Sequence, residues 1–495
     1  MLIPLNPLLS TPLYLQIVEH VCLLVRGGQL NVGDRLPSTR ALADQLSVHR
    51  STVINAYDEL RARGLIDSAQ GSGSYISANL RELTRNPAPQ RDQYPIDDQN
   101  IERLTSELWQ ANHDKSIISL ALGTPPEDLF PMQAIERCRN LVIRRDGGHA
   151  YGYEMPQGYL PLRVEIARDL ARHGILCDAD EIIITSGVQE ALTLTSRALA
   201  SPNDVALVQQ PHFFSDLANF RHLRLRGVGF GLNEHGPNRL DLEYALTLCR
   251  EGGSGSYPRF IVVSPDYQNP IGVCWDAQNR LAFLHWAADH EIRVIEDATY
   301  RDVAYEPQPN PPLRALDAEV LYLGSYSKSL MPGLRIGYVL ARGSLREQLI
   351  SMKRITTTSS ESLGQRTLAA FLAAGAYAEH LERVNAIYAL RRNALHEALQ
   401  RYLPAGCSWW LPNGGYYVWL NLPPTMDAMR IYTQALARGL AIFPSAPFYL
   451  LDNQPHTQAL RLCFVRYPED VLTYAVRMLG QIMNSLNNQR QFKNT

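Results

Sequence analysis

Lysine is rare in this 495-residue chain, and one lysine lies where a reactive amine would be useful. Only Lys115, Lys328, Lys353 and Lys493 occur among the 47 basic residues. An arginine guanidinium stays protonated, whereas a lysine amine can be deprotonated by burial or by a neighbouring cation and then attack a carbonyl carbon. Lys328 follows the apolar run 321–324 in a turn of small residues, which makes it the leading candidate for amine chemistry. An ordinary surface lysine after a strand is the alternative.

Apolar runs of strand length recur through the long C-terminal part of the chain. They begin at Ile182, Val205, Phe260, Ile292 and Val320, and helical patterns lie between them. This alternation predicts an α/β fold with a mostly parallel sheet and helices on its faces. Ligands of such sheets gather at the carboxyl ends of the strands, so the residues that follow each run form the candidate site.

The residues after the first three runs suit a flat, phosphorylated ligand. Residues 186–189 form a glycine turn that opens a helix, whose free amides would bind a phosphate. An ordinary glycine turn is the alternative. Phe213 follows the second run and would stack on a flat ring, although a core position is equally compatible with it. Asn269 follows the third run in a turn that exposes its amide.

The fourth and fifth runs add groups that a charged aromatic ring would need. Asp297 and Tyr300 stand three residues apart on one side of a turn. A carboxylate that stays ionised at a strand end needs a cationic partner, and a protonated pyridine nitrogen would supply one. Ser325 and Arg335 flank Lys328 and are candidates for binding a phosphate.

Taken in order, these five segments resemble the fold-type I pyridoxal-phosphate enzymes, the aspartate aminotransferase superfamily, over residues 118–485. The resemblance implies a mostly parallel sheet with helices on both faces, a smaller C-terminal α/β domain, and pyridoxal 5'-phosphate as cofactor. Lys328 would carry the cofactor as a Schiff base, and Asp297 would pair with its pyridine nitrogen. The ring would be stacked by Phe213 and its phenolic oxygen bonded by Asn269 and Tyr300. The phosphate would be held by Gly187, Val188, Gln189, Ser325 and Arg335.

Two further positions follow from the same resemblance. Tyr153 matches the tyrosine that reaches the phosphate of the neighbouring subunit, which implies a homodimer. Arg461 matches the arginine that clamps a substrate carboxylate. A core tyrosine and a strand-edge arginine are the alternatives. The chain departs from many relatives at Phe213, where the hydrogen bond of a phenol is lost, and at Gln210, which replaces a common acid.

The first 80 residues carry a different pattern, of three short helices and a hairpin. An apolar stripe over residues 13–25 predicts a helix that the glycines at 27–28 stop. Ser38 can cap a second helix, and residues 48–60 give a tight turn and a third helix with an apolar face. Residues 65–76 indicate two strands around a Gly/Ser turn, which would be a wing.

Polar side chains lie on the outward side of this N-terminal pattern. Short side chains and an arginine at the start of the third helix suit phosphate and base-edge contacts in a major groove. Residues 1–80 contain six arginines and six acidic residues, so no basic field marks the module. A small helical docking domain is therefore the alternative, and a neutral module implies modest DNA affinity without a second copy. The candidate DNA-binding residues are Arg35, Ser38, Thr39, Arg40, His49, Arg50, Ser51, Thr52, Asn55 and Gly73.

Segments 33–43, 48–53 and 64–76 together resemble the GntR-type winged helix-turn-helix. Joined to the aminotransferase-like part, they make the chain resemble the MocR-type transcription regulators. This resemblance implies a winged helix in residues 1–78 and an aminotransferase-like domain in residues 116–490. Residues 79–115 are polar and proline-rich, without sustained periodicity until Ile101, Leu104 and Leu108. We expect a linker there that would let the winged helix lie over a partner subunit.

Composition adds little about partners but more about environment. A net charge of −2 singles out neither nucleic acid, membrane nor an acidic ligand. The seven cysteines are scattered without a Cys-x-x-Cys pair or a Cys/His cluster, which indicates reduced thiols and no metal site. No apolar run approaches membrane-spanning length, so we expect a cytoplasmic protein without a membrane partner.

The two resemblances lead to a first functional hypothesis. In the MocR-type family the large domain typically binds pyridoxal phosphate and serves as effector sensor and dimer scaffold. The hypothesis is a regulator that binds DNA through the winged helix and senses an amino compound, or pyridoxal phosphate itself, through Lys328. The alternative is an active aminotransferase, in which Lys328 also shuttles a proton and Arg461 holds the carboxylate. A degenerate scaffold without cofactor is disfavoured, because all five site segments are intact.

Overall fold

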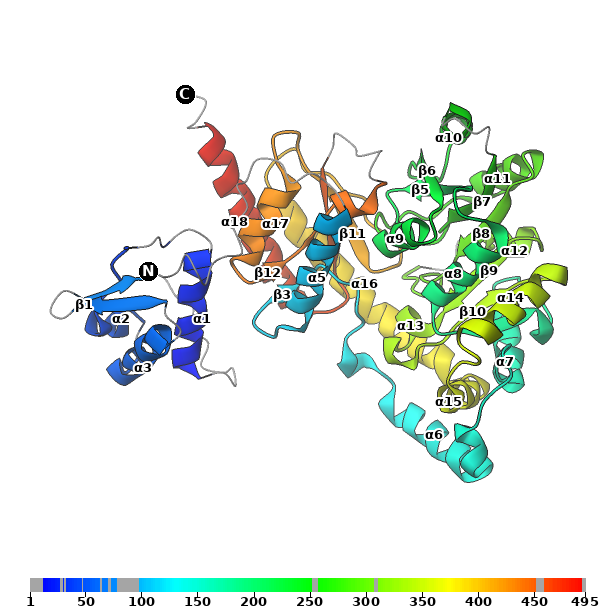
Figure 1. Cartoon of the computed structure of the whole chain (residues 1–495), viewed down its shortest axis with the longest axis horizontal. Coiled ribbons are helices and arrows are strands. Elements are labelled where there is room, and N and C mark those ends of the chain that lie inside the picture. Colours follow the sequence, from blue (N-terminus) through cyan, green and yellow to red (C-terminus); the bar gives the residue numbers. More distant parts are fainter. Residues whose placement is uncertain are drawn as a thin grey trace. The chain divides into compact units, whose positions relative to one another are not determined.

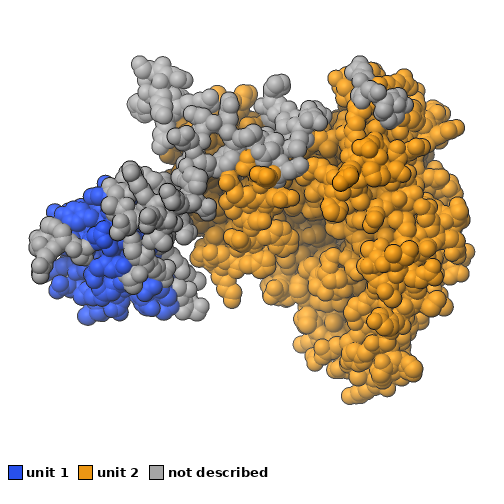
Figure 2. Space-filling model, viewed as in Figure 1, with its two compact units in different colours: residues 1–95 blue, residues 96–495 orange. Residues whose placement is uncertain are grey.

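The computed structural model divides into two compact units, residues 1–95 and 96–495 (Figure 1, Figure 2). The residues it describes are 12–26, 30, 33–46, 48–62, 65–69, 73–77, 98–251, 257–306, 310–450 and 458–491. The glycine stop predicted at residues 27–28 lies outside them.

Three helices and a two-stranded antiparallel sheet form the N-terminal unit, as predicted. The third helix buries Val53, Ala56, Tyr57 and Leu60 against the other two helices, because these positions recur on one face. Ser38 caps the second helix by accepting a hydrogen bond from the Ala41 amide at 3.2 Å. The elements are α1 (Leu13–Arg26), α2 (Thr39–Leu46), α3 (Arg50–Ala62), β1 (Ile66–Ala69) and β2 (Gly73–Ile76).

A seven-stranded sheet lies at the centre of the second unit. β10 runs antiparallel to both of its neighbours, β4 and β9, and the remaining adjacent pairs are parallel. The mostly parallel sheet predicted from the sequence is confirmed. Across the sheet the strands are β4 (Ile182–Thr185), β10 (Gly337–Leu340), β9 (Leu321–Ser325), β8 (Arg293–Asp297), β7 (Pro258–Val263), β5 (Val205–Gln210) and β6 (Arg226–Gly231).

Helices cover both faces of this sheet (Figure 1). Successive strand residues point to opposite faces, so Ile183 joins one apolar core and its neighbours Ile182 and Ile184 another. On the Ile183 face lie α8 (Val188–Leu199), α9 (Phe214–His222) and α14 (Gly343–Thr356). On the other face lie α6 (Met132–Asp146), α7 (Leu160–Ala171), α10 (Arg239–Glu251), α11 (Ala277–Asp289), α12 (Leu313–Leu316) and α15 (Ser362–Ala373).

A smaller α/β part completes the second unit. β14 pairs antiparallel with β11 and β13, and β12 pairs with β3. Its strands are β3 (Ile118–Ser119), β11 (Tyr417–Asn421), β12 (Leu440–Ala441), β13 (Phe443–Pro444) and β14 (Ala459–Cys463), and its helices are α16 (Ala376–Tyr402), α17 (Ala428–Leu436) and α18 (Glu469–Gln491). Among the described residues, no helix has the length and apolar character that a bilayer crossing requires.

Short helical turns connect several of these elements. They are α13 (Tyr326–Ser329), η1 (Glu127–Leu129), η2 (Gly147–Tyr151), η3 (Ala179–Glu181), η4 (Pro332–Leu334) and η5 (Ala446–Phe448).

The structure corrects the linker predicted for residues 79–115. Its C-terminal half forms helix α5 (Asp98–His113), which belongs to the second unit. Leu104 and Leu108 are buried in the main core of that unit, and Tyr432 donates a hydrogen bond to Glu107 at 3.0 Å. α5 contacts the nearby strand β3 and also β12 and Tyr432, which lie more than 300 positions further along the chain, so the local sequence does not show the full surface that covers it. Residues 78–97 lie outside the described part of the chain.

Candidate functional site

The site segments predicted from the sequence meet at one edge of the large sheet. β5, β7, β8 and β9 are consecutive parallel neighbours, so their carboxyl ends lie together. Asp297 is at one of these ends, and Phe213, Asn269 and Lys328 follow the other three. Asp297 is the last residue of β8 and pairs with Leu323 of β9, whose strand leads directly into the turn that carries Lys328.

Lys328 is partly buried in the short helix α13. Its Nζ donates a hydrogen bond to the carbonyl oxygen of Gly123 at 2.6 Å, and the Tyr416 hydroxyl donates to the Lys328 carbonyl at 2.5 Å. Burial lowers the pKa of Lys328 to about 8, and the nearby cations Arg461 and Arg335 act in the same direction. A larger fraction of this amine is therefore unprotonated at neutral pH than of an exposed lysine.

Asp297 is a carboxyl group whose ionised form is destabilised by its surroundings. Its Oδ1 accepts hydrogen bonds from the Thr299 amide at 2.9 Å and from the Thr299 hydroxyl at 2.6 Å. Burial raises its pKa to about 6, and the carboxylate of Asp216 adds to the increase. A positive charge placed against Asp297 would stabilise its ionised form.

Arg461 and Asn269 lie in direct contact. The guanidinium donates through Nη1 to Asn269 Oδ1 at 2.8 Å and through Nη2 to the Ala121 carbonyl at 2.6 Å. Its central carbon lies 4.1 Å from the ring centroid of Tyr417, and the rings of Phe443 and Phe448 lie at 4.8 and 4.7 Å. Arg461 is 1% exposed, and its Nε has no hydrogen-bond partner among the described residues.

Tyr300 lies beside a second phenol. Its hydroxyl is 3.3 Å from the hydroxyl of Tyr417, and both side chains are buried. The Tyr417 hydroxyl packs so closely on Gly123 that a Cβ at residue 123 would lie 2.0 Å from it. Gly123 thus connects the paired phenols to the Lys328 amine, for which its carbonyl is the acceptor.

The turn at residues 186–189 joins β4 to α8, and the Arg335 side chain lies against it. Gly187 has a φ of 93°, and a Cβ there would lie 2.8 Å from Arg335 Nη2, so both the backbone conformation and the space require glycine. Arg335 Nη2 donates to the Ser186 carbonyl at 2.7 Å. Ser325 caps α13, where its hydroxyl accepts from the Ser327 amide at 3.2 Å.

Gln189 and Phe213 each contact neighbouring side chains of the same region. The Gln189 side chain donates to Asp216 at 2.7 Å, so Val188 and Gln189 offer their backbone amides at the start of α8. His212 bonds the other oxygen of Asp216 at 2.8 Å. Phe213 lies at the N-terminus of α9 with its ring centroid 4.7 Å from that of Phe214.

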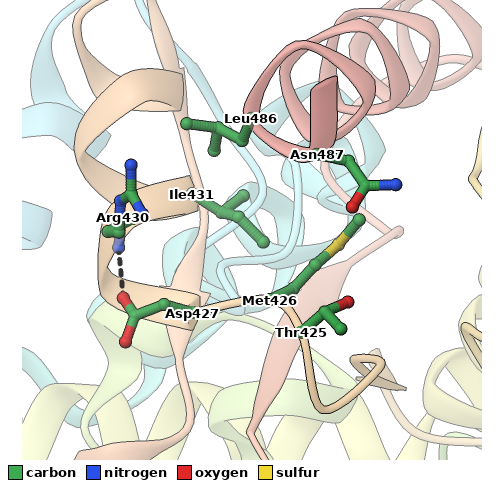
Figure 3. Close-up of a pocket in the computed structure, with 7 residues that line it drawn as sticks. All are labelled: Thr425, Met426, Asp427, Arg430, Ile431, Leu486 and Asn487. Atoms are coloured by element: carbon green, nitrogen blue, oxygen red, sulfur yellow. Dashed lines mark hydrogen bonds between the residues drawn. The ribbon is translucent and has the colours of Figure 1, made fainter. Parts of the chain in front are cut away.

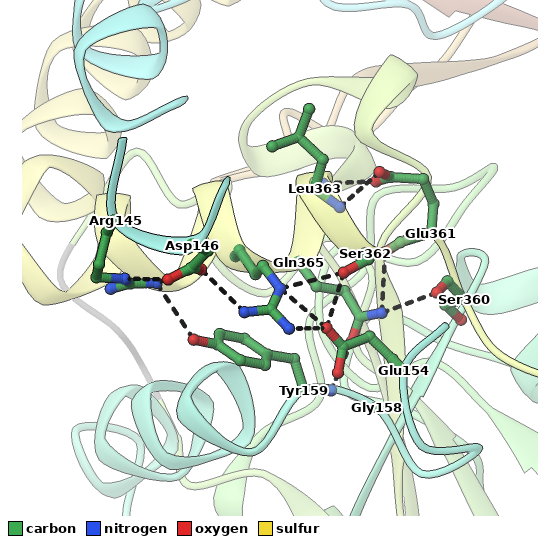
Figure 4. A network of polar contacts seen from close by, with 12 residues as sticks. Arg145, Asp146, Glu154, Gly158, Tyr159, Ser360, Glu361, Ser362, Leu363 and Gln365 are labelled. Atoms are coloured by element: carbon green, nitrogen blue, oxygen red, sulfur yellow. Dashed lines mark hydrogen bonds and ion pairs between the residues drawn. The ribbon is translucent and has the colours of Figure 1, made fainter. Parts of the chain in front are cut away.

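Tyr153 is 91% exposed and follows η2. The next residue, Glu154, accepts hydrogen bonds from Arg366 at 2.6 and 3.0 Å and from the Ser362 hydroxyl at 2.8 Å. Arg366 also donates to Asp146 at 2.9 Å, so α15 holds the segment that contains Tyr153 through Asp146 before it and Glu154 after it (Figure 4).

The candidate DNA-binding residues are all at least partly accessible. Thr39 and Thr52 are half-buried, and the other eight are exposed. His49 Nδ1 is 2.7 Å from the Ser51 hydroxyl, and Arg50 donates to Thr39 at 3.5 Å, which joins the starts of α2 and α3. In the wing, the Arg35 guanidinium approaches Gly73 and lies 6.0 Å from the Tyr75 ring centroid.

Comparison with known proteins covers both units. Residues 115–479 match the family of class I and II aminotransferases, and residues 13–76 match the bacterial regulatory proteins of the gntR family. The uncharacterized HTH-type transcriptional regulator YdfD of Bacillus subtilis strain 168 is 32% identical over 436 residues, which cover 87% of this chain and 89% of YdfD. The chain belongs to the MocR-type transcription regulators.

Solved structures match the aminotransferase-like part of this MocR-type chain. The multiple substrate aminotransferase of Thermococcus profundus is 28% identical with a TM-score of 0.72, and the match covers 78% of this chain and 95% of the enzyme. The α-aminoadipate aminotransferase LysN of Thermus thermophilus, complexed with N-(5'-phosphopyridoxyl)-L-leucine, is 28% identical with a TM-score of 0.71 over the same shares. Pyridoxal 5'-phosphate is the cofactor of this fold-type I family.

Several residues that contact the candidate site residues were not predicted from the sequence. Gly123 is separated from Lys328 by 205 positions, and Tyr417, Phe443 and Phe448 surround Arg461 from two strands of the small sheet and the turn η5. No local pattern marks these contacts.

A cavity of about 230 Å³ lies elsewhere, beside helices α17 and α18. Met426 and Ile431 face Leu486 and Asn487 across it, and Asp427 caps α17 by accepting from the Arg430 amide at 2.7 Å (Figure 3). It is lined by none of the residues around Lys328, so it is separate from the candidate site.

Proposed function

We propose that this regulator binds DNA through its winged helix and binds pyridoxal 5'-phosphate around Lys328, where an amino compound alters the state of the site. The observation that carries the proposal is a partly buried lysine amine, with its pKa lowered to about 8, just after β9, whose last residue Ser325 lies across Gly337 from Thr185, the residue before the glycine turn that opens α8. The same chain carries a winged helix with accessible polar side chains.

Three features support the fit of the cofactor. The amides at the start of α8 and the Arg335 guanidinium would hold its phosphate at the Gly187 turn, with Ser325 beside them. Asp297, whose pKa is raised to about 6, would pair with the protonated pyridine nitrogen. Phe213 would stack on the ring, and Asn269 and Tyr300 would donate to the phenolic oxygen.

Pyridoxal phosphate, when bound, supplies an aldehyde that condenses reversibly with amines. Lys328 would hold the cofactor through its Nζ, which in this structure donates to the Gly123 carbonyl at 2.6 Å. Arg461 would bind a carboxylate of the amino compound, since its buried Nε still needs an acceptor. Regulation requires that the amino compound favour one arrangement of the protein over the other.

A homodimer completes the proposal. Tyr153 is 91% exposed, and Tyr151 and Met155 beside it are 67% and 70% exposed. Such a row of large apolar side chains is typical of a surface that a second subunit covers. Tyr153 would reach the phosphate of the partner subunit, and each winged helix would lie over the partner.

The decisive experiment substitutes the reactive amine. Lys328→Ala is expected to abolish the absorption of the lysine-bound cofactor, and to leave basal DNA binding intact while removing its response to amino compounds. The DNA would be a site selected from a random pool by the full-length protein, and the probes would be the proteinogenic amino acids added singly. Lys115→Ala is the matched control, because Lys115 is exposed.

An unaltered response of DNA binding in Lys328→Ala would contradict the proposal. Repeated conversion of amino acids to keto acids by the wild-type protein, without any effect of those amino acids on DNA binding, would contradict it from the other side.

A further inference from the structure

Lys353 is a buried cation near the candidate phosphate site. It lies in the last turn of α14 and is 0% exposed. Its Nζ contacts the two oxygens of Glu190 at 3.3 and 3.4 Å and the hydroxyls of Thr357 at 3.2 Å and Ser360 at 2.9 Å. A buried ammonium is costly, and a methionine would fill the same space at lower cost, so the charge itself calls for an explanation.

Glu190 connects this cation to the turn. It lies in the first turn of α8, and its Oε2 accepts a hydrogen bond from the Ser186 amide at 2.5 Å. Arg335 holds the carbonyl of the same residue at 2.7 Å. Both backbone groups of Ser186 are therefore fixed by side chains, and this orients the turn at Gly187 that follows.

The negative charge of Glu190 is unfavourable for binding a phosphate at the turn that Glu190 orients. A carboxylate in the first turn of a helix is favourable for the helix, but it would repel a phosphate bound at the same N-terminus. The Lys353 ammonium lies against this carboxylate and compensates its charge. The side chain of Glu190 is 12% exposed, so solvent screens its charge weakly.

We propose that Lys353 is a positioning residue that neutralises Glu190, so that Glu190 shapes the phosphate turn without repelling the phosphate of the cofactor. The pair thereby preserves the preference for phosphorylated over unphosphorylated pyridoxal that the α8 amides and Arg335 would provide. The inference rests on the proposed function, since it assumes that this turn binds the phosphate. It assigns a role to Lys353, which is fully buried and takes no part in the proposed amine chemistry at Lys328.

The test compares the affinity of the apoprotein for pyridoxal 5'-phosphate and for pyridoxal, by absorbance titration. Both ligands condense with the same lysine, so the ratio of their dissociation constants isolates the contribution of the phosphate. Lys353→Met is expected to lower the preference for pyridoxal phosphate on the order of tenfold, because Glu190 is left uncompensated. Adding Glu190→Gln is expected to restore the preference to within roughly threefold of wild type, because the repelling charge is gone. Lys115→Met, at an exposed site, is the control.

If Lys353 has a purely structural role, adding Glu190→Gln should not restore the preference for pyridoxal phosphate. A double variant whose preference is no higher than that of Lys353→Met would therefore overturn the inference. An unchanged preference in Lys353→Met alone would overturn it as well. Where Lys353→Met does not fold, Glu190→Gln alone decides. It keeps an acceptor oxygen for Ser186 beside an uncompensated ammonium, so the preference should rise, and a fall would overturn the inference. If the wild-type protein binds neither ligand, the proposed function fails. If it binds both, but the substitutions do not change the preference for pyridoxal phosphate over pyridoxal, only this inference fails.

Discussion

The Gly123 peptide is the point at which two parts of the site meet. Its carbonyl accepts from the Lys328 amine at 2.6 Å, and its Cα faces the Tyr417 hydroxyl without room for a side chain. The position of the amine therefore depends on a residue far from it in sequence. Since Tyr417 also lies 3.3 Å from Tyr300, a change at Gly123 is expected to disturb both groups.

Gly123→Ala should weaken the cofactor site more than the fold. The added Cβ would lie 2.0 Å from the Tyr417 hydroxyl, so either the phenol or the 123 backbone must move. Overpacking of this kind costs about 1–3 kcal/mol, and we expect a loss of cofactor affinity of roughly tenfold, measured by absorbance titration. Gly333→Ala is the control, because nothing lies within 4 Å of a Cβ at residue 333. Equal affinities of the two variants would contradict the role given to Gly123.

Asp297 should make the apoprotein less stable above its pKa. Burial raises this pKa from 3.8 to about 6, so the folded state binds a proton that the unfolded state has lost between these values. The stability contribution of Asp297 therefore falls as the pH rises from 3.8 to 6 and stays low above 6. Asp297→Asn should stabilise the apoprotein at neutral pH by about 1–3 kcal/mol relative to wild type, while it weakens cofactor binding. Denaturant unfolding of both proteins at pH values below and above this range measures the difference in their free energies of unfolding. If this difference does not become smaller in acid, the prediction is wrong.

At the scale of elements, strands and helix caps were predictable from the sequence because their signals are local. The five apolar runs became β4, β5, β7, β8 and β9, and the polar residues after them lie at one edge because parallel strands end together. The apolar spacing of Ile101, Leu104 and Leu108 is visible in the sequence, but it does not show that α5 packs in the second unit, because Tyr432, which bonds Glu107 of α5, lies 325 positions further along the chain. The Lys328–Gly123 contact was missed for the same reason, since nothing near either residue specifies the other.

Helix α5 should therefore be part of the folded second unit rather than a tether. Leu108 is 0% exposed in the core that α5 shares with that unit, and Leu108→Ala should reduce the free energy of unfolding of the unit by about 2–5 kcal/mol. Gln110→Ala, at an exposed position of the same helix, should change it by less than about 0.5 kcal/mol. Denaturant unfolding of the full chain separates the two outcomes, and a tether would show no difference between the variants.

At the scale of the whole molecule, the N-terminal unit has its own core but little net charge. Its apolar cluster is built from all three helices and both strands, so the unit has what it needs to fold alone. Six arginines and six acidic residues over positions 1–80 leave it without the basic field that gives tight non-specific DNA binding. Its affinity for DNA should therefore depend on the pairing of two copies through the second unit.

A fragment of residues 1–95 should consequently bind DNA far more weakly than the full chain. Two winged helices joined through a dimer bind a two-part site with an effective concentration that raises the affinity by about 10²–10⁴-fold over one copy. The measurement compares fragment and full chain on the same selected DNA by fluorescence anisotropy, with Arg50→Ala in both as the control for specific contact. Arg50→Ala should weaken both proteins, because Arg50 is exposed at the start of α3. Equal affinities of fragment and full chain would show that the second unit adds nothing to DNA binding, and the proposed dimeric regulator would have to be abandoned.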